Sequence, residues 1–225
     1  EEIFDSGALG KCESIFCQGN GYLGLRAAAE EEYENTRRSL LVAGTFDKMP
    51  DDATELPNAA DVTAMDIRIN GEPLDLTKGE CKNYSRTLNL KNGILKRSFL
   101  WTSEKGDEIQ FEAWRVVSLK DLHLIASKIQ ITALNQDISL SVRSGIDGDR
   151  IPAPVHFSLQ GKQENNGMLN LTAKTNESGV LFSLSSVQKA EIGGKQTEIT
   201  ARTQAESGMK IYPETAAAVA KGETF

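Results

Sequence analysis

The amino-acid sequence predicts an all-β protein, a large antiparallel β-sandwich with little helix. From residue 62 onward, short apolar segments of period two alternate with turns that contain Gly or Asn. These segments recur every 8–12 residues or so, which predicts about 15 to 18 strands in the chain and exceeds one small sandwich. We therefore expect two large stacked sheets in a single domain that covers residues 1–225.

The first predicted element is a hairpin around Asn20-Gly21, which lies between two apolar runs. An Asn-Gly pair favours a type I′ turn because both residues tolerate positive φ angles. Gly19 and Gly24 flank the pair, although each interior glycine destabilises a strand by roughly 0.5–1 kcal/mol relative to alanine. The excess predicts that another structure approaches this backbone closely, and a β-bulge is the alternative.

Two non-repetitive segments follow the hairpin. Residues 28–38 have helix-forming composition without an apolar stripe, so we expect a loop or a short exposed turn of helix. The glutamates at 30–32 are expected to be solvated surface groups. Residues 47–61 are rich in Pro, Asp and Asn, which predicts a long loop of the kind that is often functional.

The remaining elements are predicted strands. Ile67 and Ile69 alternate with polar residues before an Asn-Gly turn at 70–71, and the same logic defines every later strand. The predicted strands lie at residues 66–69, 88–90, 94–99, 109–116, 122–134, 138–142, 155–160, 168–174, 180–188, 197–204 and 209–212.

Composition excludes several functional classes. A net charge of −7, without a basic patch, argues against nucleic acid and anionic membranes as partners. Three cysteines without framework spacing indicate free thiols in a cytoplasmic protein, and with only two histidines we expect neither a metal site nor a cofactor. No apolar run reaches the roughly 18 residues of a transmembrane helix.

Six motifs occur in an order that resembles glycoside hydrolase family 65. They are NGYLGLR at 20–26, AGTFD at 43–47, ELPN at 55–58, RINGEPLDL at 68–76, YSRTLNLKNGILKRSFLW at 84–101 and RVVSLKDLHL at 115–124. The family contains maltose, trehalose, kojibiose and nigerose phosphorylases and acid trehalases. Ala27 and Asn89 depart from its usual Gly and Asp.

The resemblance implies a galactose-mutarotase-like super-sandwich that precedes an (α/α)₆ catalytic barrel. The barrel carries the catalytic glutamate and binds inorganic phosphate, a co-substrate of the parent enzyme. Long segments of 3.6-residue periodicity are missing here, so the chain is predicted to be the N-terminal domain without catalytic residues. The expected parent is a maltose phosphorylase, with trehalose or kojibiose phosphorylase or an acid trehalase as alternatives.

The resemblance also implies partners, namely the C-terminal barrel and a second copy in a homodimer. Candidate residues at the interface and the active-site rim are Asn20, Gly21, Tyr22, Gly24 and Arg26. For Arg26 we favour a salt bridge at the domain interface.

A second hypothesis is a carbohydrate-binding module for α-glucans that stacks sugars on Trp101, Trp114 or Tyr22. Both tryptophans lie in alternating strands, where a place in the core or on a sheet face is the favoured interpretation. A third hypothesis, a small mutarotase-type enzyme, requires a histidine and a glutamate at a cleft. Scattered His123 and His156 argue against it.

Overall fold

The structure, a computed structural model, describes residues 1–49, 53–149, 156–197 and 208–225. These residues contain 18 strands and a single α-helix, which confirms the all-β prediction. A 3₁₀ turn, Ser6–Ala8, leads into the helix α1 (Leu9–Ile15).

The strands are β1 (Gln18–Gly19), β2 (Leu23–Leu25), β3 (Leu40–Val42), β4 (Met65–Ile69), β5 (Glu72–Pro73), β6 (Glu80–Asn89), β7 (Ile94–Thr102), β8 (Glu108–Val117), β9 (Ile125–Ala133), β10 (Ile138–Ser144), β11 (Ile146–Asp147), β12 (Phe157–Asn165), β13 (Met168–Thr175), β14 (Leu181–Val187), β15 (Ala190–Ile192), β16 (Lys195–Thr197), β17 (Lys210–Ile211) and β18 (Glu214–Val219).

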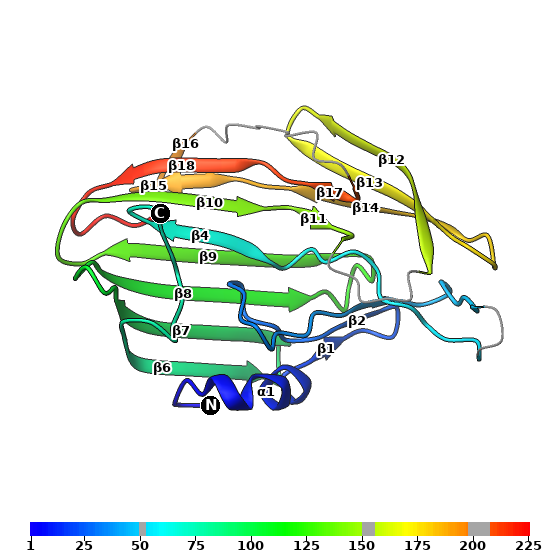
Figure 1. Cartoon of the computed structure of the whole chain (residues 1–225), viewed down its shortest axis with the longest axis horizontal. Coiled ribbons are helices and arrows are strands. Elements are labelled where there is room, and N and C mark those ends of the chain that lie inside the picture. Colours follow the sequence, from blue (N-terminus) through cyan, green and yellow to red (C-terminus); the bar gives the residue numbers. More distant parts are fainter. Residues whose placement is uncertain (50–52, 150–155, 198–207) are drawn as a thin grey trace.

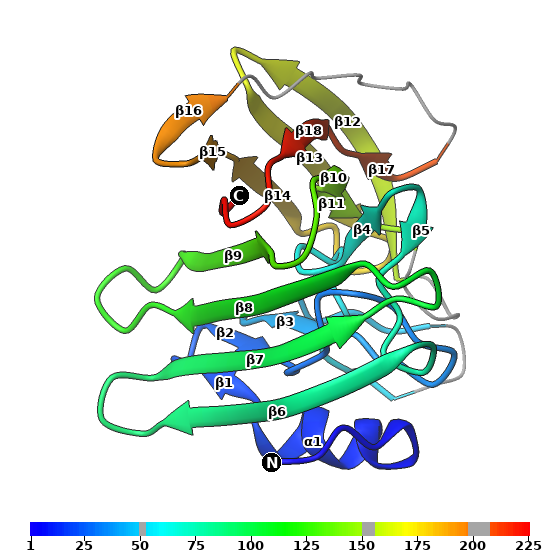
Figure 2. The ribbon, with the colours of Figure 1, turned by 90° about the vertical axis from the view of Figure 1, so that its left-hand side faces the viewer.

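Two four-stranded antiparallel sheets form the sandwich (Figures 1 and 2). One has the order β6-β7-β8-β9 and the other β18-β10-β4-β5. Figure 2 shows β6 to β9 as one broad layer in which the β6–β7 and β8–β9 turns lie at the same end, beside β1 and β2. The predicted hairpin around Asn20-Gly21 therefore lies at the same end of the molecule as the β6–β7 and β8–β9 turns.

The main core lies between these two sheets. Ile67 and Leu140 face it from one sheet, and Phe99 and Phe111 from the other, their rings stacked at a centroid distance of 4.7 Å. Along β7 buried and partly buried residues alternate, as a strand with one face on the core requires. Each of these side chains stabilises the fold by about 1.5–3 kcal/mol through removal from water.

Smaller sheets complete the domain. β1-β2-β3 and β12-β13-β14 are three-stranded, while β11 with β17 and β15 with β16 form two-stranded pairs. A second core contains Ile146 of β11 together with Phe157 of β12 and Leu171 of β13. The C-terminal residues join the first sheet, where Phe225 and Ile131 exchange two backbone hydrogen bonds of 3.0 Å.

Several boundaries differ from the predictions. Helix α1 was not predicted because it contains a glycine and spans only seven residues; burial of Leu9 and Cys12 stabilises it. Residues 28–38 form no helix, and their first part is buried rather than exposed. The strand predicted at 122–134 begins at Ile125. Of the strand predicted at 197–204, all but the first residue lies outside the described residues.

Candidate functional site

The β1–β2 hairpin places the turn at residues 18–24, called here the Asn20 turn, against the ends of β6 to β9. Gln18 Nε2 donates hydrogen bonds to the backbone oxygens of Gly93, at 2.6 Å, and Arg115, at 3.0 Å. Asn20 Nδ2 donates to the oxygens of Ser118, at 2.7 Å, and Leu122, at 3.0 Å. Two amide side chains thus fix the turn to the β6–β7 and β8–β9 connections.

The Asn20 turn is not the type I′ turn predicted from its sequence. Gly21 has a φ of 88°, whereas Asn20 is not among the residues with positive φ. Asn20 Oδ1 instead accepts hydrogen bonds from the backbone N–H groups of Tyr22 and Leu23, at 3.0 and 2.7 Å. This Asx-type turn competes with the I′ geometry. The Asn70-Gly71 pair, with φ angles of 49° and 82°, does adopt the positive-φ conformation.

The glycines of the turn have different local roles. Gly19 and Gly24 lie opposite each other in a continuous β1–β2 register, so no bulge occurs at this point of the hairpin. A Cβ atom on Gly24 would lie 3.6 Å from Leu41 Cβ, an ordinary contact, whereas one on Gly19 would lie 3.1 Å from the oxygen of Leu23. Close packing inside the domain therefore explains Gly19 but does not require Gly24.

Four exposed leucines lie in the β6–β7 and β8–β9 connections, to which the Asn20 turn is bonded. The exposed fractions are 88% for Leu90, 74% for Leu119, 42% for Leu122 and 47% for Leu124. We call these four residues the leucine face. Large apolar side chains gathered on one surface are typical of a protein–protein contact.

Tyr22 lies in the same region. Its ring stacks on His123, with centroids 4.3 Å apart and planes 17° apart. The structure thereby brings together the predicted residues Asn20, Gly21 and Tyr22 with His123, which the sequence left without a role. Their meeting depends on contacts about 100 residues apart in the chain.

Arg26 lies at the end of β2 and faces α1. Its Nε is 3.1 Å from Glu13 Oε2, and its Nη2 donates a 2.7 Å hydrogen bond to the oxygen of Gly10. The predicted salt bridge therefore has a partner within this domain. The Glu13 carboxylate is fully buried, so Arg26 supplies the charge that its burial requires.

The inner face of the first sheet carries a cluster that the sequence did not predict. Arg86, Arg97 and Arg115, from β6, β7 and β8, are buried there, and Arg86 and Arg97 are direct cross-strand partners. Like charges in that position repel each other unless carboxylates compensate them. We call these three residues the arginine cluster.

Two glutamates supply the compensation, so the prediction of solvated glutamates at 30–32 is wrong for Glu30 and Glu31. Arg97 Nη1 donates to Glu30 Oε2 at 2.8 Å and to Glu31 Oε2 at 2.7 Å, and Arg115 Nη2 donates to Glu30 Oε1 at 2.6 Å. Burial alone would raise the pKa of Glu30, but Arg115 and Arg97 outweigh it and hold that pKa below its usual value. The carboxylate is therefore ionised at neutral pH.

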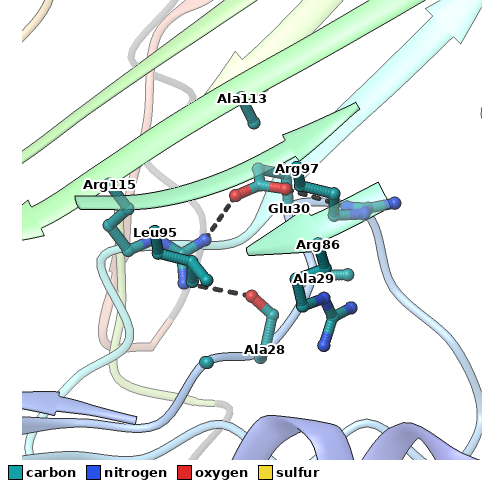
Figure 3. Close-up of a pocket in the computed structure, with 9 residues that line it drawn as sticks. Ala28, Ala29, Glu30, Arg86, Leu95, Arg97, Ala113 and Arg115 are labelled. Atoms are coloured by element: carbon teal, nitrogen blue, oxygen red, sulfur yellow. Dashed lines mark hydrogen bonds and ion pairs between the residues drawn. The ribbon is translucent and has the colours of Figure 1, made fainter. Parts of the chain in front are cut away.

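A small cavity of about 10 Å³ adjoins the cluster (Figure 3). The three arginines, Glu30 and five apolar side chains line it. Figure 3 shows Arg115 reaching the carboxylate of Glu30 and the oxygen of Ala28, and Arg97 reaching the same carboxylate. No interaction is drawn between Arg86 and the other lining residues.

The two tryptophans occupy different environments. Trp101 is 2% exposed in the main core and donates its indole N–H to the oxygen of Lys78 at 2.9 Å, so its ring is closed to a sugar. Trp114 lies on the outer face of the sheet, where the Nζ atoms of Lys96 and Lys128 lie 5.2 and 5.6 Å from its ring centre. The favoured interpretation, core or sheet face, describes both positions.

His156 is the other histidine that the sequence offered. It is buried, with Nδ1 3.3 Å from Asp47 Oδ2 and Nε2 2.5 Å from Glu55 Oε1. Asp47 also accepts hydrogen bonds from the backbone N–H groups of Glu177 and Ser178, so it joins His156 to the β13–β14 turn. Within the described ranges, no group of three or more His, Cys, Asp or Glu residues could hold a metal ion, and no helix is long and apolar enough to cross a membrane.

Fold and site together define an antiparallel super-sandwich domain with four exposed leucines in the β6–β7 and β8–β9 connections and an internal ion-pair cluster. The family model described as glycosyl hydrolase family 65, N-terminal domain, matches residues 1–225. The chain belongs to this family.

Individual relatives are similar over part of their own length. A kojibiose phosphorylase of Halothermothrix orenii is 36% identical over 211 residues, which are 91% of this chain and 27% of that protein. A nigerose phosphorylase of Lachnoclostridium phytofermentans is 33% identical over 133 residues, 59% of this chain and 17% of the relative. A solved structure of a proposed kojibiose phosphorylase from the human microbiome has the same fold, with a TM-score of 0.76 at 18% identity over 100% of this chain and 31% of that one.

Proposed function

We propose that this chain is the non-catalytic N-terminal domain of an inverting phosphorylase that acts on an α-linked glucose disaccharide. Its role is to pack on a C-terminal catalytic part and to shape the rim of the active site. The observation that carries the proposal is the leucine face, which adjoins the Asn20 turn at one end of the sandwich. The relatives extend well beyond the matched region, since this chain spans 27% of the Halothermothrix orenii protein.

The parent activity is proposed from the relatives. We favour kojibiose as the substrate over maltose, which the motifs led us to expect, because the relative that matches 91% of this chain is named a kojibiose phosphorylase. We also propose a homodimer and a cytoplasmic location, the latter because Cys12, Cys17 and Cys81 are all free thiols. Release of glucose 1-phosphate from a panel of disaccharides by the whole protein tests the substrate.

The docking role predicts a specific loss of activity. Changing Leu119 and Leu122 to aspartate in the whole protein should reduce phosphorolysis at least tenfold, because buried charges would separate the catalytic part from the leucine face. Both side chains are exposed in this domain, so its own unfolding free energy should change by less than about 0.5 kcal/mol for each substitution. Enzyme kinetics and thermal denaturation measure the two effects.

The matched control is Leu181→Asp, since Leu181 is 65% exposed on β14, in a different sheet. It should leave both activity and stability unchanged. Full activity of the Leu119/Leu122 variant, or an equal loss in the control, would refute docking at the leucine face.

Gly24 gives a second prediction for the same interface. In the isolated domain Gly24→Ala should be tolerated, because the new Cβ makes an ordinary contact with Leu41. If another part of the protein approaches this backbone, the same change should lower the activity of the whole protein by more than its thermal stability explains. Gly21→Ala is the contrast: its φ of 88° strains an alanine, so it should destabilise the isolated domain by about 1 kcal/mol. A large loss of domain stability in Gly24→Ala would make that glycine structural.

A further inference from the structure

Asn-Gly pairs occur at residues 20–21, 70–71, 92–93 and 166–167 of the chain. Such a pair can deamidate without an enzyme, because glycine has no Cβ atom to shield its backbone nitrogen. That nitrogen loses its proton and attacks the asparagine Cγ. A C–N bond forms, the Cγ–Nδ2 bond breaks, and Nδ2 leaves with the proton as ammonia. Water then opens the succinimide ring, and the product is aspartate or isoaspartate.

Hydrogen bonds on the asparagine amide slow this reaction, because the side chain must rotate before Cγ meets the glycine nitrogen. The amide of Asn20 makes the four hydrogen bonds of the Asn20 turn. The amide of Asn70 makes two, since Nδ2 donates to Asp107 Oδ1 at 2.8 Å and Oδ1 accepts from the N–H of Ser139 at 2.8 Å. Each bond that must break slows the reaction by roughly fivefold at the usual net value of a hydrogen bond. The fold therefore protects both asparagines.

The pair at 92–93 is held by fewer bonds to its side chain. Asn92 is exposed, and its Oδ1 accepts one hydrogen bond, from the N–H of Ile94 at 3.1 Å. The nucleophile is occupied as well, because the N–H of Gly93 donates to the oxygen of Asn89 at 2.8 Å. Two bonds must therefore break before the Gly93 nitrogen attacks, so Asn92 should also react slowly.

Asn166 combines an unbound side chain with an accessible nucleophile. It is exposed in the β12–β13 turn, and its amide makes no hydrogen bond with the described residues. The N–H of Gly167 donates to Glu164 Oε1 at 3.2 Å, and this carboxylate can accept the proton that the nitrogen must lose. We infer that Asn166 is the site at which this protein deamidates.

Deamidation at Asn166 changes the charge and one turn of the main chain. The new carboxylate takes the net charge from −7 to −8. Isoaspartate also lengthens the backbone of a turn in which Asn166 and Gly167 have φ angles of 51° and 77°. Figure 2 shows β12 and β13 on the side of the molecule opposite α1. The deamidated domain should therefore stay folded, with its Asn20 turn intact.

Peptide mapping by mass spectrometry tests the inference on the unchanged protein. After incubation in mildly alkaline buffer, the peptide that contains Asn166 should hold aspartate and isoaspartate, and a more acidic form should accumulate on isoelectric focusing. The initial rate at Asn166 should exceed the rates at Asn20 and Asn70 by at least about tenfold, because more bonds hold these two side chains. In concentrated urea, which removes the hydrogen bonds of the folded state, the rates at all the Asn-Gly pairs should converge.

Glutamine variants assign the acidic form to one residue. Asn166→Gln should prevent its appearance, because the longer side chain would have to close a larger, less favoured ring. Asn92→Gln, the matched change in another exposed turn, should leave it unaffected. Deamidation at Asn20 or Asn70 as fast as at Asn166, a spread of rates that persists in urea, or an undiminished acidic form in Asn166→Gln would each overturn the inference. The peptide map requires no variant, so it decides even if Asn166→Gln folds poorly.

Discussion

Replacing Arg97 by methionine should lower the free energy of unfolding by about 3–5 kcal/mol, the cost of leaving buried charges unpaired. Arg97 is 3% exposed and binds Glu30 and Glu31 through three ion-pair contacts. Its guanidinium also lies 5.0 Å from the ring centre of Phe99. The substitution fills similar volume but strands Glu31, which the structure pairs with no other arginine among the described residues. Urea denaturation of the isolated domain measures the loss.

Lys96→Met is the matched control because Lys96 precedes Arg97 on the same strand and faces outward. Its Nζ lies 2.7 Å from Glu112 Oε1, but the pair is partly exposed to solvent, so its loss should lower the free energy of unfolding by less than about 1 kcal/mol. In a double-mutant cycle, Arg97→Met combined with Glu31→Gln should destabilise less than the sum of the single changes. A cost for Arg97→Met as small as that of Lys96→Met would show that the arginine cluster contributes little to stability.

The arginine cluster shows why the sequence predicted the strands but not the buried ion pairs on their inner face. Leu95, Phe99 and Trp101 follow the inward face of β7, and Arg97 occupies the same face between them. An arginine at an inward position of an alternating strand does predict that a buried carboxylate lies beside it. The identity of that partner could not be predicted, because Glu30 and Glu31 lie 67 and 66 residues away from Arg97 in a segment without periodicity.

In the rest of the fold, too, local features were predicted from the sequence and long-range contacts were not. Local turn chemistry, such as Asn70-Gly71 with its positive φ angles, set strand boundaries that the structure confirms. Helix α1 follows no local rule and depends on burial of Leu9. At the Asn20 turn, the sequence identified the right segment but the wrong conformation. The side chain of Asn20 bonds to residues 98 and 102 positions away, and these long-range bonds accompany the Asx geometry.

Replacing Asn20 by alanine should therefore have the second large effect, a loss of about 2–4 kcal/mol for four hydrogen bonds at the usual net value for each. Two of these bonds shape the turn itself, through the N–H groups of Tyr22 and Leu23. The other two join it to Ser118 and Leu122 in the β8–β9 turn. Activity of the whole protein should fall further than stability alone predicts, because the leucine face loses its fixed position relative to the turn.

Asn20→Asp separates the two halves of this effect. A carboxylate still accepts from Tyr22 and Leu23 but cannot donate to Ser118 and Leu122, so it should lose about half of the stability that alanine loses. Asn92→Ala is the control from a neighbouring turn, where Asn92 Oδ1 accepts one exposed hydrogen bond of 3.1 Å from the N–H of Ile94. Its loss should stay near 1 kcal/mol or below. If Asn20→Ala is as mild as Asn92→Ala, the long-range bonds do not hold the turn, and the leucine face must be positioned by β8 and β9 alone.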